Sequence, residues 1–284
     1  MQHNTKLKLN PRDKNEHQSL DIEYDFQNQL AWYRMNATPR PCFTPQLLLE
    51  ISKWFHELAT NQALTQINYV VLASESKNIF NLGGDLKLFY QYIKNNDRTG
   101  LLHYAMACID VLYLNNVGLN NQTTTISLVQ GDALGGGFEA AISSDVLIAE
   151  RSSKMGMPEI LFNLFPGMGA YSFLSRKIGG AKAEKMILSG KLYSAEEMFD
   201  LGIVDVLVED GMGEQAVYDY IKKENRARNG FQALRQAKRH CNPVTYEELK
   251  NITTIWVDAA LNLSDKDLRM MQRLVHRQSA KTNT

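Results

Sequence analysis

Residues Val129–Phe165 read VQGDALGGGFEAAISSDVLIAERSSKMGMPEILFNLF, and this stretch decides the fold. Three consecutive glycines, Gly135–Gly137, lead into a segment whose composition favours a helix. The run that ends at the start of the stretch, Thr124–Val129, is β-branched and apolar, which is typical of a buried strand. The expected local order is therefore strand, glycine turn and helix.

The glycine turn has the properties of a site for a negatively charged oxygen. Glycine lacks a Cβ, so a ligand can approach its main chain closely. The first N–H groups of a helix have no intrahelical partner, and they lie at the positive end of the helix dipole. The same glycines would also let the helix pack closely on the strand, and the turn alone does not distinguish the two roles.

A second glycine corner lies upstream of the first. Residues 80–86 (FNLGGDL) follow an apolar run, Ile67–Ala73, which is expected to be a strand, and precede an amphipathic helix expected over Leu86–Lys94. Asp85 stands just before this helix and is expected to cap it rather than to act in catalysis. Strand–corner–helix units therefore recur, which predicts a layered α/β core with crossover connections.

Four segments of the chain, in this order, are similar to the pattern of the crotonase (enoyl-CoA hydratase/isomerase) superfamily. They are FNLGGDL at 80–86, GGGFE at 135–139, PE at 158–159 and PGMG at 166–169. Within the superfamily, the wider segments most resemble the diffusible signal factor synthases. These segments are FNLGGDL, ALGGGFEAA at 133–141, PEILFNLFPGMGAYSF at 158–173 and TTIWVDAAL at 253–261. The resemblance extends from Tyr24 to Ser279.

The resemblance implies an α/β fold, with a crotonase-like ββα spiral core and a helical C-terminal region. The core is expected over residues 20–208. The helical region is expected over residues 209–284, which relatives use to assemble into trimers or dimers of trimers and to cover the active site. Residues 1–19 carry few apolar groups, so we expect a flexible N-terminal tail. Some relatives are restrained by the receiver domain of a sensor kinase, which makes such a domain a candidate partner.

The resemblance also implies which residues carry the chemistry. The N–H groups of Gly84 and Gly136 would form the oxyanion hole for a thioester carbonyl, and Glu139 and Glu159 would be the catalytic acid and base. Two carboxylates in one apolar pocket do not both ionise readily, so one should hold a proton near neutral pH. We assign Glu159 to remove the C2 proton of a 3-hydroxyacyl thioester and Glu139 to protonate the departing hydroxyl, although the two roles could be exchanged. Neither a metal nor another cofactor is expected.

Six apolar residues are candidates for the wall of a fatty-acyl pocket, although apolar residues at such spacing usually form plain core. Trp256 is the strongest candidate, because its neighbours Ile252, Ile255 and Ala259 can supply the core face of the same helix. The candidates are Met157, Leu161, Phe162, Phe165, Met168 and Trp256.

The composition argues against several other classes of protein. Lys+Arg and Asp+Glu are equal at 31 each, so the formal net charge is zero, which argues against a nucleic-acid partner or an anionic membrane surface. The three cysteines, Cys42, Cys108 and Cys241, form no CxxC pattern, so we expect free thiols in a reducing cytoplasm. No signal peptide is recognisable, and no segment has the ~20 apolar residues of a membrane span. A cytoplasmic protein is therefore expected.

The principal hypothesis is a dehydratase and thioesterase. It would act on 3-hydroxyacyl thioesters of acyl carrier protein (or coenzyme A) and release a free cis-2-unsaturated fatty acid signal. Only the similarity to one branch of the superfamily favours it. An ordinary enoyl-CoA hydratase would use the same glutamates for hydration. A third hypothesis is a catalytically idle scaffold that binds RNA or a signalling partner, and the presence of both glutamates argues against it.

Overall fold

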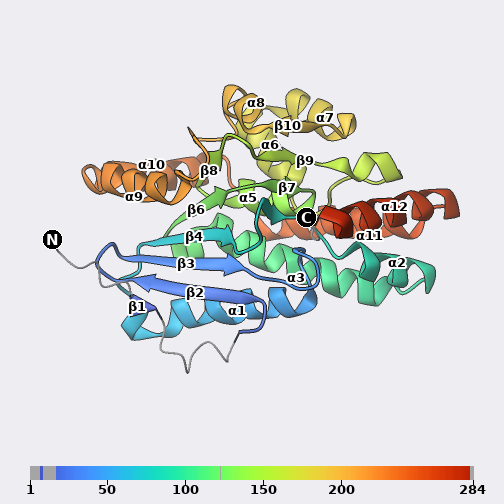
Figure 1. Cartoon of the computed structure of the whole chain (residues 1–284), viewed down its shortest axis with the longest axis horizontal. Helices are drawn as coiled ribbons and strands as arrows, with labels where there is room; N and C mark the ends of the chain where they lie inside the picture. Colours follow the sequence, from blue (N-terminus) through green and yellow to red (C-terminus); the bar gives the residue numbers. More distant parts are fainter. Residues whose placement is uncertain (1–6, 9–16, 122, 282–284) are drawn as a thin grey trace.

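The computed structural model describes residues 7–8, 17–121 and 123–281 of the chain (Figure 1). Most of the expected N-terminal tail, residues 1–19, lies outside the described residues. Within that segment, the backbone N–H groups of Gln18 and Ser19 donate to the Glu50 carboxylate, both at 2.9 Å. This contact attaches the start of the core to helix α1 (Pro45–Thr60).

The larger of two sheets contains seven of the described strands, in the order β1-β2-β3-β4-β6-β8-β11. The first three strands pair antiparallel, and every pair from β3 to β11 is parallel. Its central strands are buried almost throughout, as expected for parallel strands covered on both faces. The strands are β1 (Leu7–Lys8), β2 (Leu20–Asp25), β3 (Leu30–Met35), β4 (Tyr69–Ser74), β6 (Thr124–Val129), β8 (Val146–Glu150) and β11 (Val206–Val208).

The smaller sheet has the order β10-β9-β7-β5, and three of its strands continue directly from strands of the larger sheet. The chain passes from β4 to β5, from β6 to β7 and from β8 to β9, and each of these pairs is followed by helix. This repeat of two strands and a helix is the ββα spiral that was predicted. The strands are β5 (Ile79–Asn81), β7 (Asp132–Leu134), β9 (Lys154–Gly156) and β10 (Leu192–Ser194).

Alternating side chains of the larger sheet enter two separate cores. Val70 and Leu72 of β4 belong to the main core, which also contains residues of α1, α3 (Arg98–Asn116) and α5 (Gly136–Ser143). Tyr69 and Val71 belong to a second core, which is closed by Val217 and other apolar residues of α9 (Gly213–Asn225). Helix α9 therefore covers one face of the sheet, although it falls within the segment expected to form a C-terminal helical region.

Helix α2 has the bounds predicted from apolar periodicity, and the residues after 208 that the structure describes are mostly helical, as expected. The α-helices after α1 are α2 (Leu86–Lys94), α3 (Arg98–Asn116), α4 (Gly118–Asn121), α5 (Gly136–Ser143), α6 (Ala170–Ile178), α7 (Gly180–Ser189), α8 (Ala195–Asp200), α9 (Gly213–Asn225), α10 (Arg228–Cys241), α11 (Tyr246–Leu261) and α12 (Asp265–Lys281). Two short 3-10 helices are η2 (Gln62–Leu64) and η3 (Pro158–Phe162).

The last two helices lie beside the glycine corners. Helix α11 packs against α3, and α12 packs against both α2 and η3 (Figure 1). Two ion pairs join α11 and α12 to the helices that they pack on. They are Arg98 with Asp258 at 2.8 Å and Lys94 with Asp265 at 2.5 Å. The C-terminal helices thus reach the region where the predicted site residues meet.

Candidate active site

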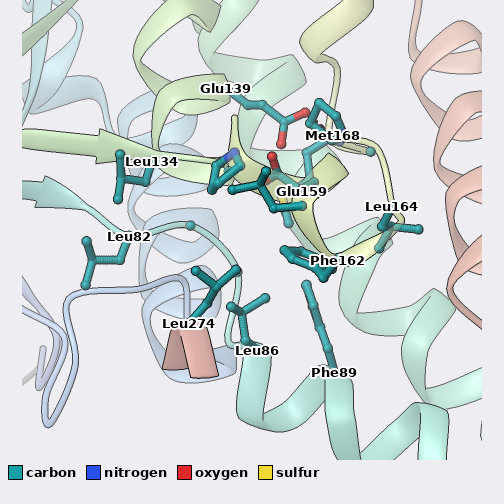
Figure 2. A pocket seen from close by; sticks show the side chains of 18 of the residues that line it. Leu82, Leu86, Phe89, Leu134, Glu139, Glu159, Phe162, Leu164, Met168 and Leu274 are labelled. Atoms are coloured by element: carbon teal, nitrogen blue, oxygen red, sulfur yellow. Dashed lines mark hydrogen bonds between the residues drawn. The ribbon is translucent and has the colours of Figure 1, made fainter. Parts of the chain in front are cut away.

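A cavity of about 310 Å³ lies where the two glycine corners, η3 and the last two helices meet (Figure 2). Ligand pockets typically enclose about 300–1,000 Å³, so the cavity has the size of a small one. Its polar groups are the backbone of the two corners and the carboxyl groups of Glu139 and Glu159. Its apolar wall includes Leu82, Leu86, Phe89, Leu134, Leu161, Phe162, Leu164, Met168, Leu192, Trp256 and Leu274.

The two glycine corners bring two free N–H groups together. Gly136 is the first residue of α5, so its N–H has no acceptor within the helix. A Cβ placed on Gly136 would lie 3.4 Å from the nitrogen of Gly84, which shows how closely the corners approach. Among the hydrogen bonds of the described residues, neither of these two N–H groups has a partner. Both N–H groups can therefore donate to a single oxygen atom that gains negative charge during a reaction.

Glycine at position 83 is required for this arrangement. Gly83 has a φ of +92°, which disfavours any side chain, and a Cβ there would lie 2.9 Å from the nitrogen of Gly136. A larger residue at this position would thus cover one of the two N–H groups. Asp85 accepts from the N–H groups of Lys87 and Leu88 and pairs with Arg40 at 2.7 Å, which confirms the prediction that Asp85 caps α2.

Glu139 lies in the first turn of α5 and is 1% exposed. Its Oε1 accepts from the N–H groups of Met168 at 2.8 Å and Ala170 at 2.9 Å, at the start of α6. Burial raises the pKa of Glu139 to about 7, although the two N–H groups partly oppose that shift. The residue can therefore exchange a proton near neutral pH and also holds the loop before α6.

Glu159 follows Pro158 in η3, and its carboxyl group lies against the other corner. A Cβ on Gly135 would lie 2.3 Å from Oε1 of Glu159, so only glycine leaves room for this carboxyl group. The Oε2 atom is buried and has no hydrogen-bond partner. Burial and then repulsion from Glu139 raise the pKa of Glu159 to about 8. The carboxyl groups of the two glutamates approach each other in Figure 2.

The electrostatics favour one shared proton on this pair of carboxyl groups. Ionising both would place two negative charges in an apolar cavity, which is costly. Glu139 receives two N–H groups that stabilise its ionised form, whereas one oxygen of Glu159 receives none. The proton therefore rests mainly on Glu159 when no substrate is bound.

Four of the six apolar residues that were candidates for the pocket wall line the cavity, and two do not. Leu161, Phe162, Met168 and Trp256 line it. Met157 is 1% exposed and belongs to the main core, because the backbone before Pro158 is extended and precedes the turn of η3. Phe165 lies beyond the left-handed residue that ends η3, where it packs against the main core rather than the cavity.

Seven leucine and phenylalanine residues of the wall were missed by sequence reasoning. Leu86 and Phe89 lie on the apolar face that predicted α2, so that face could have identified them. Leu274 of α12 and Leu192 of β10 follow no motif, and their places depend on tertiary packing. The missed residues are Leu82, Leu86, Phe89, Leu134, Leu164, Leu192 and Leu274.

Neither a metal site nor a membrane span is found within the described ranges. No group of three or more His, Cys, Asp or Glu side chains in residues 7–8, 17–121 and 123–281 could hold a metal ion. No helix in the same ranges combines the length and apolar character needed to cross a bilayer.

Known proteins share this sequence pattern. The pattern of the enoyl-CoA hydratase/isomerase family matches residues 25–280. The fatty acid oxidation complex subunit alpha of Pseudomonas syringae pv. tomato is 30% identical over 171 residues, which cover 59% of this chain and 23% of that protein. The peroxisomal fatty acid beta-oxidation multifunctional protein of Arabidopsis thaliana is 34% identical over 132 residues, or 46% of this chain and 18% of that protein. The chain thus spans less than a quarter of the length of these relatives.

Solved structures share the fold at low sequence identity. DspI of Pseudomonas aeruginosa has a TM-score of 0.68 and 24% identity, over 79% of this chain and 89% of that one. Human mitochondrial delta3-delta2-enoyl-CoA isomerase has a TM-score of 0.77 and 17% identity, over 93% of this chain and 99% of that one. Because the family pattern covers residues 25–280 and the ββα spiral is present, the chain belongs to the enoyl-CoA hydratase/isomerase family of the crotonase superfamily.

Proposed function

We propose that the chain dehydrates a 3-hydroxyacyl thioester in this cavity and then hydrolyses the product to a free cis-2-unsaturated fatty acid. The observation that carries the proposal is the geometry of the site. Two buried carboxyl groups, with no cationic partner among the described residues, approach each other beside two N–H groups that none of those residues accepts from, inside an apolar wall suited to an acyl chain. Activity on carrier-protein thioesters is supported by the sequence resemblance to the diffusible signal factor synthases.

The N–H groups of Gly84 and Gly136 would bind the thioester carbonyl oxygen. Loss of the C2 proton converts the thioester to an enolate, and the negative charge collects on this oxygen. Preorganised donors are worth ~10²–10³ in rate each, because they need no rearrangement as the charge develops. Mutation tests backbone donors poorly, so the carboxyl groups provide the clearer test.

The two glutamates would move the protons. In dehydration, Glu159 removes the C2 proton and protonated Glu139 donates to the departing 3-hydroxyl group. The C2–C3 double bond forms as the C3–O bond breaks and water leaves. Dehydration by this assignment starts with Glu139 protonated and Glu159 ionised. When no substrate is bound, that protonation state is the less populated one. Exchanging the two roles would remove that requirement, so both assignments stay open to test.

Hydrolysis would use the same site a second time. One carboxylate would take a proton from water, which attacks the thioester carbonyl while the two N–H groups stabilise the tetrahedral oxyanion. The thiol then leaves with a proton, and a free acid remains. Assembly as a trimer and contact with a receiver domain stay predictions of the resemblance.

Ordinary enoyl-CoA hydration is the second candidate, and two observations favour it. The named curated relatives are proteins of fatty acid oxidation. The proton distribution without substrate also suits hydration: ionised Glu139 can activate water, and protonated Glu159 can protonate C2. The two candidates differ in whether the thioester bond survives.

Incubation with 3-hydroxyacyl thioesters separates the candidates. Chains of several lengths would be supplied on acyl carrier protein and on coenzyme A, and mass spectrometry would follow free acid and thioester. Free cis-2-enoic acid, absent with Glu139→Gln and Glu159→Gln, is the expected result. A product that stays esterified would identify a hydratase. No turnover of any thioester would favour the non-catalytic scaffold.

A further inference from the structure

The loop that carries Gly84 runs beside residues 41–43 like a short parallel strand, with Phe43 and Gly84 as its bridge pair. The N–H of Phe43 donates to the carbonyl of Gly83 at 2.8 Å, and the N–H of Leu82 donates to the carbonyl of Pro41 at 2.8 Å. The carbonyl of Gly83 and the N–H of Gly84 belong to one trans peptide group and point in opposite directions, so the bond from Phe43 to this carbonyl turns the N–H of Gly84 away from residues 41–43. The pairing therefore aims that N–H at the cavity.

A tyrosine hydroxyl lies where the next backbone hydrogen bond of this pairing would be expected to form. In a regular parallel ladder, the N–H of Asp85 would donate directly to the carbonyl of Phe43. Here the N–H of Asp85 donates to the hydroxyl of Tyr104 at 3.1 Å, and that hydroxyl donates to the carbonyl of Phe43. The hydroxyl is thus a spacer that fixes the loop on the C-terminal side of Gly84.

Tyr104 is suited to a fixed spacing role. Its side chain is 5% exposed on α3, and its ring packs edge-on against Phe89, with the ring centroids 5.3 Å apart. Phe89 in turn lies against Gly84, where a Cβ would be 2.4 Å from the Cζ atom of its ring. Burial raises the pKa of Tyr104 well above its ordinary value, so the hydroxyl remains a donor throughout the neutral range.

We propose that Tyr104 is a positioning residue for the reaction: its hydroxyl, between Asp85 and Phe43, sets the direction of the Gly84 N–H. Tyr104 itself does not line the cavity and acts only through the loop. The inference rests on the proposed function, because it assumes that the N–H of Gly84 stabilises a developing oxyanion. Sequence motifs did not indicate this residue, since it lies nineteen positions after Asp85 on another helix.

The test is Tyr104→Phe, which keeps the ring and its contact with Phe89 and removes only the oxygen. The matched control is Tyr33→Phe. Tyr33 is 1% exposed, and its hydroxyl donates to Asn115 of the same helix α3 at 3.0 Å. Tyr104→Phe loses two hydrogen bonds of a buried hydroxyl and Tyr33→Phe loses one, so both should unfold at a lower temperature than the wild type. Only Tyr104→Phe changes the loop that carries Gly84.

Kinetics distinguish positioning from general destabilisation. An imperfectly aimed oxyanion donor weakens the transition state more than the bound substrate, so Tyr104→Phe should lower kcat ~10- to 100-fold with little change in KM. The pH profile should not move, because the glutamates are untouched. Equal kcat losses in both tyrosine variants, or a loss confined to KM, would overturn the proposal.

A readout without turnover separates this inference from the proposed function. In protein labelled with ¹⁵N-glycine, the amide resonance of Gly84 should shift in Tyr104→Phe and stay in place in Tyr33→Phe. If the wild type turns over no thioester but the resonance shifts, the proposed function fails and the spacing role of Tyr104 stands. An unchanged Gly84 resonance together with unchanged kcat would refute the positioning role.

Discussion

Two of the regions that bury carboxyl groups compensate the negative charge in opposite ways. Beside β6, Glu224 is fully buried and receives the Arg235 guanidinium at 2.7 and 2.5 Å and the Thr124 hydroxyl at 2.9 Å. In the active-site cavity, Glu139 and Glu159 make no ion pair with any Lys or Arg of the described ranges.

Under the proposed function, this difference is what separates structural from reactive carboxyl groups in one fold. A buried carboxylate with a guanidinium and further hydrogen bonds has its charge compensated. A buried carboxyl group without a cation keeps its proton to higher pH, and its pKa approaches the range where acid–base catalysis works. The predictions below test whether the missing cation is what distinguishes the cavity.

The largest expected effect is the loss of turnover on neutralising either carboxyl group of the cavity. General acid–base groups contribute ~10²–10⁴ each, so Glu139→Gln and Glu159→Gln should lower kcat for a 3-hydroxyacyl thioester by at least ~10³-fold. Both variants should keep the circular dichroism spectrum of the wild type. Turnover within ~10-fold of the wild type in either variant would remove that residue from the mechanism.

Glu224→Gln is the matched change in the other region, and it should affect stability instead. Removing one member of a buried pair leaves the Arg235 guanidinium without its closest counter-charge, which typically costs about 3 kcal/mol. Urea unfolding should therefore show a lower midpoint, while kcat per folded molecule stays at the wild-type value. Similar urea midpoints for the variant and the wild type would show that Asp145, 3.9 Å from Arg235, can replace Glu224.

The four residues that the resemblance named as candidate oxyanion hole and acid–base pair do line one cavity, because their places depend on local backbone geometry. Gly84 and Gly136 lie at strand-to-helix corners, and such a corner needs glycine wherever another segment of the chain approaches closely. Glu139 and Glu159 are fixed to those corners by short segments. Strands and helices with a clear apolar pattern could also be predicted, because that pattern is a property of consecutive residues. Short strands such as β7 (Asp132–Leu134) were missed, because three residues show no periodicity.

The wall of the cavity could not be predicted in the same way, because it depends on how segments rotate and pack. The segment after Met157 is a 3-10 helix, in which residues three apart share a face. Glu159 and Phe162 thus face the cavity together, whereas the turn at Asn163 carries Phe165 away. Leu274 reaches the cavity only because α12 packs on η3. No spacing in a single sequence encodes that contact.

The smallest expected effect is a pH-dependent gain in stability when Glu159 is neutralised. Its pKa rises from 4.5 to about 8 on folding, so between those values the unfolded chain binds fewer protons than the folded one. Folding stability therefore decreases as pH rises through this window, and it levels off above about pH 8. Glu159→Gln has no proton to lose. Its advantage over the wild type should grow from near zero at low pH to a plateau above about pH 8, and the direction of this trend in Tm is the expected result.

Two control variants test the direction of this pH-dependent change in stability. Glu139→Gln should show the same trend over a window that ends near pH 7, because burial raises its pKa only to about 7. Glu197 is an exposed residue whose pKa is lowered by Lys191 and by the backbone N–H of Ser194, so its favourable contribution is present at alkaline pH and lost on acidification. Glu197→Gln should therefore fall below the wild type at alkaline pH, where Glu159→Gln rises above it. Calorimetric scans at several pH values would show both trends. If Glu159→Gln instead lost stability on alkalinisation, a cation or a hydrogen-bond donor would have to reach that carboxyl group, and the contrast with Glu224 would no longer hold.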